Sequence, residues 1–229
     1  QAIVRAGAIA MPLNWRLAAA EHARILELCP PALLVAERDF FSHARGLSDT
    51  CSAQFQVLLC EVLAGETPTD QSSAARPAPA ASAGDVPVLI CHTSGSTGAP
   101  KAVTLTADAI FFNAVNATHM HDLTSADRIL TTLPMFHVGG LNIQTLPALH
   151  AGACVTLHAK FDPLAAIETI ERDRITLTVL VPAQLVAMME HPRWADADLS
   201  SLRMITTGST IVSQAFVQRV QARGLRVIQ

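Results

Sequence analysis

The chain has 229 residues, 50% of them hydrophobic, and its 16 basic and 19 acidic side chains give a formal charge of −3 at pH 7. This length and composition allow a sizeable core, and the small negative charge gives no reason to expect a nucleic acid or an anionic membrane as partner. No apolar run reaches the ~18 residues of a membrane span, and no secretory signal is visible, so we expect no transmembrane segment and a cytoplasmic location.

Short apolar segments alternate with segments of helical periodicity along the chain. The pattern predicts an α/β fold with largely parallel sheets flanked by helices. The predicted strands are 33–35, 55–59, 88–91, 128–133, 154–157, 177–181, 203–206 and 225–229, and the predicted helices are 21–29, 106–121, 141–150, 163–173, 183–190 and 213–223.

Composition suggests three parts. Residues 1–63 form a first α/β part, 64–87 an Ala/Pro/Ser-rich loop that cannot build a core, and 88–229 a second α/β part. The chain opens on Gln1 and ends in a predicted strand, which we interpret as an interior piece of a longer protein. Its five cysteines are scattered without a CxxC pair, so we expect reduced, mostly buried thiols rather than disulfides or a zinc site.

The strand at 88–91 leads into a loop of hydroxyl residues and glycines that ends in a lysine. The glycines let the backbone turn tightly and present its N–H groups, the hydroxyls add donors, and the lysine adds a positive charge. This chemistry suits a polyphosphate, although the spacing excludes a Walker A motif. The residues are Thr93, Ser94, Gly95, Ser96, Thr97, Gly98 and Lys101.

Two later segments also follow predicted strands. One is Leu-Pro-Met-Phe-His-Val-Gly-Gly-Leu at 133–141, which places His137 where ligands of open α/β sheets tend to bind. The other runs from Met204 into Gly208, Ser209 and Thr210. Taken singly, each is weak evidence, because a histidine or glycine after a strand is commonly structural. His119 and His121 predict a solvated helix end rather than a metal site, since residues two apart do not share a helix face.

Together the three segments resemble the adenylate-forming superfamily of AMP-dependent synthetases and ligases, in its acyl- and aryl-CoA synthetase branch. The family's phosphate loop reads Thr/Ser-Ser-Gly-Ser/Thr-Thr-Gly-x-Pro-Lys-Gly, which the segment from Thr93 to Lys101 fits at every fixed position, with Ala102 in place of the last glycine. His137 falls in the Pro-x-Phe-His-x-x-Gly segment, and Gly208 in the segment that is usually Gly-Gly-Ala-Pro or Gly-Ser-like.

The resemblance implies activation of a carboxylic acid by ATP, giving acyl-AMP and pyrophosphate, followed by transfer to coenzyme A. It implies that the loop from Thr93 to Gly98 and Lys101 hold the ATP phosphates, that Thr97 helps to hold Mg²⁺, and that His137 borders the acyl pocket. Gly208, Ser209 and Thr210 would contact the adenine. His137 and Lys101 are the expected catalytic residues.

Other parts of the family pattern lie outside this sequence. They are the Tyr-Gly-x-Thr-Glu segment, the ribose-binding aspartate, and the small C-terminal domain with its catalytic lysine. We therefore expect the chain alone to be inactive.

Several alternatives remain open. Amino-acid-activating enzymes usually carry Asp where this chain has His137, which favours an acid without an α-amine. A luciferase-like enzyme, a kinase or NTPase, and a non-catalytic nucleotide-binding fragment are the other classes. A role in fatty acid metabolism and a homodimeric assembly are also expected, but the sequence does not identify the acid.

Overall fold

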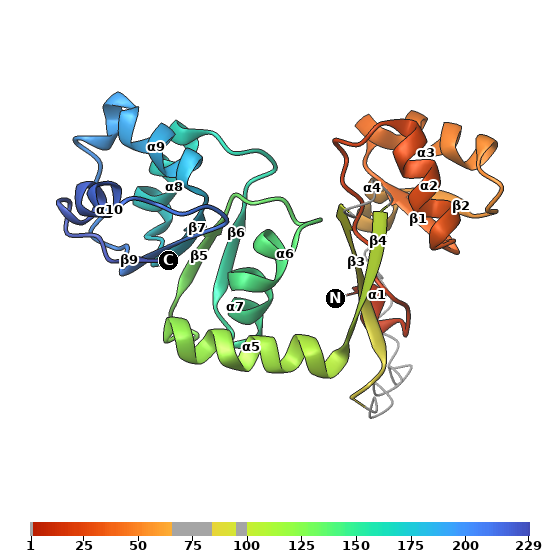
Figure 1. Cartoon of the computed structure of the whole chain (residues 1–229), viewed down its shortest axis with the longest axis horizontal. Coiled ribbons are helices and arrows are strands. Elements are labelled where there is room, and N and C mark those ends of the chain that lie inside the picture. The colour runs from red at the N-terminus through yellow and green to blue at the C-terminus, as the bar shows by residue number, and fades with distance from the viewer. Residues whose placement is uncertain (1, 66–83, 95–99) are drawn as a thin grey trace. The chain divides into compact units, whose positions relative to one another are not determined.

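The computed structural model describes residues 2–65, 84–94 and 100–229. The chain forms two compact units, Gln1–Ala107 and Asp108–Gln229 (Figure 1). Among the helices of the described ranges, none combines the length and apolar character needed to cross a membrane.

The first unit contains two small sheets. In one, β1 and β2 pair in parallel and α3 connects them; in the other, β3 and β4 form an antiparallel hairpin. Ala10 adds a short bridge to β3, with its N–H donating to the carbonyl of Val88 and its carbonyl accepting from Ile90. The elements are α1 (Ala2–Arg5), α2 (Ala19–Leu28), β1 (Leu33–Ala36), α3 (Arg38–Thr50), β2 (Gln56–Leu59), α4 (Cys60–Gly65), β3 (Pro87–Ser94) and β4 (Pro100–Thr106).

The second unit is built on one parallel sheet of five strands in the order β6-β5-β7-β8-β9. Its elements are α5 (Ala107–His121), β5 (Arg128–Thr131), α6 (Val138–Gly140), the π-helix η1 (Leu141–Thr145), α7 (Leu146–His150), β6 (Cys154–Leu157), α8 (Pro163–Asp173), β7 (Leu177–Leu180), α9 (Pro182–Glu190), the 3₁₀-helix η2 (Pro192–Trp194), β8 (Met204–Thr207), α10 (Gln214–Gln221) and β9 (Val227–Ile228).

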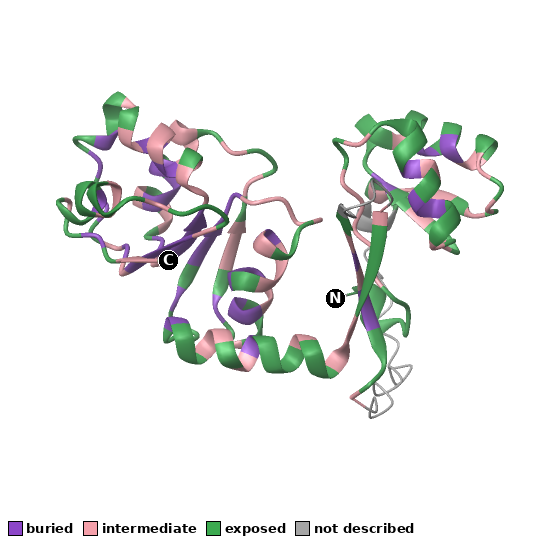
Figure 2. Cartoon of the chain, in the orientation of Figure 1, coloured by how far each residue is buried: buried purple, intermediate pink, exposed green. Residues whose placement is uncertain are grey.

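Helices cover both faces of this sheet, and the buried residues gather on its central strands (Figure 2). Because side chains alternate along a strand, neighbouring residues enter different cores. Leu130, Leu180 and Ile205 pack with α8, α9 and α10. On the opposite face, Ile129, Leu177 and Met204 pack with Ala148 of α7. This sandwich buries all four residues of β7 and of β8 and the last three of β5, threonines included.

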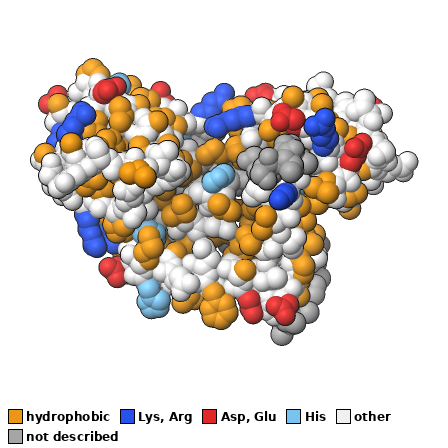
Figure 3. Space-filling model, viewed as in Figure 1, with side chains coloured by type: hydrophobic (Ala, Val, Ile, Leu, Met, Phe, Trp, Pro, Cys, Tyr) orange, Lys and Arg blue, Asp and Glu red, His pale blue; other side chains and the backbone are white. Residues whose placement is uncertain are grey.

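Hydrophobic side chains also reach the surface, as the orange atoms of Figure 3 show. On α5, Phe111 and Phe112 are about half exposed, and their rings meet edge to face. Leu157 at the end of the edge strand β6 is similarly exposed.

The predicted α/β class is confirmed, with a parallel sheet flanked by helices. Three predictions of local structure need correction. Residues 100–106 form a strand that the sequence analysis did not predict, and the helix α3 was missed. The helix expected at 141–150 begins as a π-helix and becomes α-helical only at Leu146.

Two side-chain expectations were also wrong. Of the five cysteines only Cys91 is buried, and Cys154 is exposed. His121, expected at a solvated helix end, is 1% exposed, and its carbonyl accepts a hydrogen bond from the Arg203 guanidinium. The loop proposed at 64–87 lies mostly outside the described residues, and the expected division into 1–63, 64–87 and 88–229 stays a prediction.

Candidate functional site

The two arms of the predicted phosphate loop are neighbouring strands. Thr93 on β3 is paired with Lys101 on β4, and Ser94 with Pro100. The antiparallel ladder thus brings the first hydroxyl of the motif opposite its lysine. The tip of the motif, with Gly95, Ser96, Thr97 and Gly98, lies outside the described residues.

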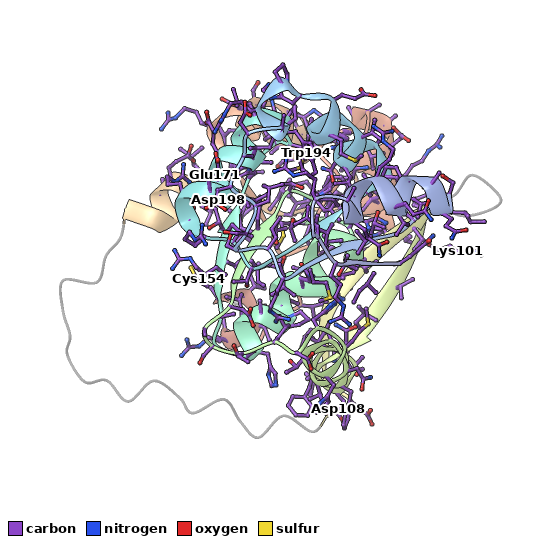
Figure 4. The ribbon with its side chains drawn as sticks, turned by 90° about the vertical axis from the view of Figure 1, so that its left-hand side faces the viewer. Lys101, Asp108, Cys154, Glu171, Trp194 and Asp198 are labelled. Atoms are coloured by element: carbon purple, nitrogen blue, oxygen red, sulfur yellow. The ribbon has the colours of Figure 1, made fainter. Side chains whose placement is uncertain are left out.

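Lys101 is exposed on the second residue of β4 (Figure 4). Within the described ranges its ammonium forms no ion pair with an acidic side chain. An exposed cation that has no acidic partner in these ranges and is paired with a threonine is suited to a phosphate group, which Lys contacts as a point charge.

His137 is exposed and lies between β5 and α6. It is the N-cap of α6, where its Nδ1 accepts a hydrogen bond of 2.9 Å from the N–H of Gly139. An Nδ1 that accepts leaves the proton of the neutral ring on Nε2. His137 can therefore present an Nε2–H donor to a ligand while the helix start holds its ring.

Gly140 permits the sharp turn that follows His137. A Cβ built on this residue would lie 2.3 Å from the carbonyl oxygen of Pro134 and 2.6 Å from that of Leu133, distances that no side chain tolerates. At Gly139 a Cβ would meet Nδ1 of His137 at 3.0 Å. The glycine pair thus lets the helix start close against the loop that carries His137.

Gly208, Ser209 and Thr210 follow β8. Ser209 adopts a left-handed backbone with φ of 66°, and its hydroxyl donates to the carbonyl of Gly208 over 2.6 Å. A non-glycine residue in this conformation is uncommon and is often found at functional sites. At Gly208 a Cβ would meet nothing within 4 Å, so the backbone there is open to a flat ligand.

The second and third motifs lie at the same edge of the sheet. His137 follows β5 and Gly208 follows β8, and the parallel strand β7 separates these two strands. Both motifs therefore leave the carboxyl edge, where open α/β sheets bind ligands. Thr93 and Lys101 belong to the first unit.

Beneath these loops lies a buried polar network that the sequence analysis missed. Thr131 and Thr145 are joined through their hydroxyls at 2.8 Å, and the Thr145 hydroxyl donates to the carbonyl of Gly140 at 2.6 Å. Gln144 donates from Nε2 to the hydroxyl of Thr206 at 3.3 Å. A glutamine inside the apolar 141–150 segment was the available signal, but its partner is 62 residues away.

The described residues contain no group of three His, Cys, Asp or Glu side chains able to hold a metal ion. Thr97, the residue expected to contact Mg²⁺, falls outside them.

The comparisons with known proteins agree with the motifs. The family described as AMP-binding enzyme matches residues 1–229. An indoleacetate–CoA ligase from Aromatoleum aromaticum is 50% identical over the whole chain, and a feruloyl-CoA synthase from Amycolatopsis is 36% identical over 98% of it. The chain spans 46% and 44% of the length of these two relatives.

Among solved structures, the inhibitor-bound N-terminal domain of FACL13 from Mycobacterium tuberculosis superposes with a TM-score of 0.87 at 27% identity. That match covers 97% of this chain and 56% of the other. The motifs, the fold and these relatives together establish that the chain belongs to the AMP-binding enzyme family of adenylate-forming acyl- and aryl-CoA ligases.

Proposed function

We propose that the full-length protein is an acid–CoA ligase that uses ATP. The acid's carboxylate oxygen attacks the α-phosphorus of ATP, a bond forms to that oxygen, and the bond to the β-phosphate oxygen breaks to release pyrophosphate. The thiolate of coenzyme A then attacks the acyl carbon and releases AMP. The 50% identity to an indoleacetate–CoA ligase over the whole chain is the observation that carries this proposal.

The first step joins two anions, so the protein must screen their charges and hold the nucleophile in line. We assign the first task to Lys101, because its ammonium forms no ion pair within the described part of the chain and the residue is paired with Thr93 across the ladder. We assign the β- and γ-phosphates to Lys101 and to the loop from Thr93 to Gly98. Mg²⁺ would enter the site bound to ATP, and Thr97 is the residue that we propose to contact it.

At the carboxyl edge of the large sheet, we assign the acid to the side of His137 and the adenine to the backbone at Gly208–Thr210. His137 is fixed by its bond from Gly139 and keeps an Nε2–H free for a polar group of the acid. The open backbone at Gly208 suits the flat face of a purine.

For the acid we propose the arylacetic class, of which indoleacetate is the member named in the nearest of these relatives. Feruloyl-CoA synthase, at 36% identity, also acts by its name on an aromatic acid. A fatty acid is the competing substrate, since the FadD13 long-chain-fatty-acid–CoA ligase of Mycobacterium tuberculosis is 28% identical.

The test is acid-dependent release of pyrophosphate by the purified full-length protein, with indole-3-acetate, phenylacetate, ferulate and palmitate as acids. We expect the highest kcat/KM with an arylacetate, together with AMP and the matching acyl-CoA as products. ATP hydrolysis to ADP and phosphate without an acid would instead indicate an NTPase, and transfer of the γ-phosphoryl group to an acceptor would indicate a kinase. A higher kcat/KM with palmitate than with the arylacetates would show that the substrate is a fatty acid.

The 229-residue chain is the natural control for this assay. It covers less than half of the relative's length, and we expect it to release no acid-dependent pyrophosphate. Cytoplasmic location and a homodimeric assembly also remain proposals, and light scattering on the full-length protein tests the second.

A further inference from the structure

A row of three side chains crosses the large sheet just below its carboxyl edge. Thr131, Val179 and Thr206 are in register on neighbouring strands β5, β7 and β8. They lie on the face covered by η1 and α7. On each strand they come two residues after the apolar row Ile129–Leu177–Met204, toward the carboxyl edge. On this face the sheet therefore changes from apolar to partly polar as it approaches the site.

The π-helix η1 spans this row. Thr145 is bonded to Thr131 at one end, Gln144 is bonded to Thr206 at the other, and Val179 between them offers no polar partner. Single π-turns are frequent at functional sites, and here the wider turn lets two consecutive polar residues reach two different strands. A narrow recess remains over the middle strand. It is lined by Thr131, Leu133, Gly139, Gly140, Gln144, Thr145 and Val179.

One polar atom of this recess is unpaired. Gln144 is 2% exposed, and its Oε1 has no hydrogen-bond partner within the described residues, although its Nε2 is held by Thr206. A buried carbonyl oxygen without a donor is unfavourable, and such atoms in a native protein call for an explanation. The recess that it borders is also lined by Gly139 and Gly140, next to the proposed acid-binding residue His137.

We propose that Gln144 is a specificity-determining residue that accepts a hydrogen bond from an N–H donor on the ring of the acid. This inference rests on the proposed function and names the feature of the arylacetate that the site selects. An indole-type N–H suits this unpaired acceptor, because it places a single donor at the edge of a flat ring. A site that offers a buried acceptor rejects analogues lacking the donor, since the acceptor would then stay unpaired.

The test compares two acids of nearly the same shape. Indole-3-acetate carries the ring N–H, and benzofuran-3-acetate replaces it with an oxygen. For the full-length enzyme we expect kcat/KM for the indole acid to exceed that for the benzofuran acid by about tenfold or more. In Gln144→Leu, which keeps the volume and removes the acceptor, the ratio should fall to about one, mainly through loss of activity on the indole acid.

Asn142→Leu is the matched control. Asn142 lies on the same π-helix, and its side-chain oxygen is also buried without a partner in the described part of the chain, but it does not line the recess. This variant should keep the ratio of the wild type. If Gln144→Leu does not fold, Thr206→Val provides the second test, because it releases the amide from its anchor and should also lower the ratio.

The outcomes separate the two proposals. Turnover of both acids with a ratio that Gln144→Leu leaves unchanged overturns the role of Gln144 alone. A wild-type preference for the benzofuran acid overturns it as well, because it would mean that the amide presents its N–H₂ to the ring. Failure of both acids to support pyrophosphate release overturns the proposed function and this inference with it.

Discussion

Arg203 and Asp127 form a two-pronged ion pair at the amino-terminal edge of the large sheet. Nε of Arg203 donates to Oδ1 of Asp127 at 3.0 Å, and Nη2 donates to Oδ2 at 2.9 Å. The same guanidinium donates to the carbonyls of His121 and Asp122, where α5 ends. One side chain thus ties β8, the start of β5 and the end of α5 together.

Asp127→Asn should therefore destabilise the protein. Asp127 is 5% exposed and accepts further hydrogen bonds from Thr176 and from the N–H of Thr124, so the substitution weakens several charged contacts at once. We expect a loss of about 2 kcal/mol in the free energy of unfolding, measured by urea denaturation. The control is Asp198→Asn, in an exposed pair with Arg174, which should change stability little. If the two variants lost the same free energy of unfolding, burial would not be the reason that the Asp127 ion pair stabilises the protein.

The same carboxylate predicts how stability depends on pH. Burial alone would raise the pKa of Asp127, but the hydrogen bonds from Arg203, Thr176 and Thr124 hold it at about 2, below the ordinary 3.8. The unfolded chain thus takes up this proton at higher pH than the folded protein. The stabilisation is complete at pH values above the pKa of Asp127 in the unfolded chain, and it is lost as pH falls toward the folded pKa of about 2. Denaturation curves between pH 5 and about pH 2.5 should show a steeper loss for the wild type than for Asp127→Asn.

Much of the large sheet could be predicted from the sequence, because β5, β7 and β8 are buried on both faces and each carries neighbouring apolar residues, such as Ile129–Leu130 and Val179–Leu180. The strand β4 was missed for the opposite reason. Residues 101–104 are exposed, and only the pairing with β3 makes them a strand. Helix α3 was missed because it buries only Ala44 and Leu47.

At the candidate site, the local sequence predicted the loops that follow the strands, but it did not predict the buried hydrogen bonds beneath these loops. His137 and Gly208 stand in recognisable segments. The hydrogen bond between Gln144 and Thr206 joins residues that are 62 positions apart, and no local sequence pattern predicts it. The π-turn that makes this bond possible also has no sequence signature of its own.

Lys101→Ala in the full-length enzyme should impair the use of ATP. A charge-assisted contact to phosphate is worth about 1.5–3 kcal/mol, so kcat/KM for ATP should fall roughly tenfold to a hundredfold. Lys160, the other lysine of the chain, provides a control, since Lys160→Ala removes the same charge from an exposed residue outside the three motifs. Native ATP kinetics in Lys101→Ala would remove this residue from the phosphate site.

His137→Ala should affect the acid more than ATP. The ring lies beside the recess in the second unit, and its loss removes the Nε2–H that we assign to the acid. We expect kcat/KM for the acid to fall on the order of tenfold while the Kd of ATP stays near the wild-type value. Isothermal titration with ATP and steady-state assays over a range of acid concentrations measure the two quantities. Native acid kinetics would make His137 only the N-cap of α6.

Two glycine substitutions should separate folding from ligand binding. In Gly140→Ala the added Cβ meets two backbone carbonyls at 2.3 and 2.6 Å, so the loop carrying His137 must shift. We expect a loss of at least about 2 kcal/mol in stability. In Gly208→Ala the Cβ meets nothing within 4 Å, and the fold should keep its stability. That methyl group would nevertheless project from the backbone surface assigned to the adenine, so the Kd of ATP should rise. Thermal denaturation and ATP titration of both variants give the comparison, and unchanged ATP affinity in a folded Gly208→Ala would place the adenine elsewhere.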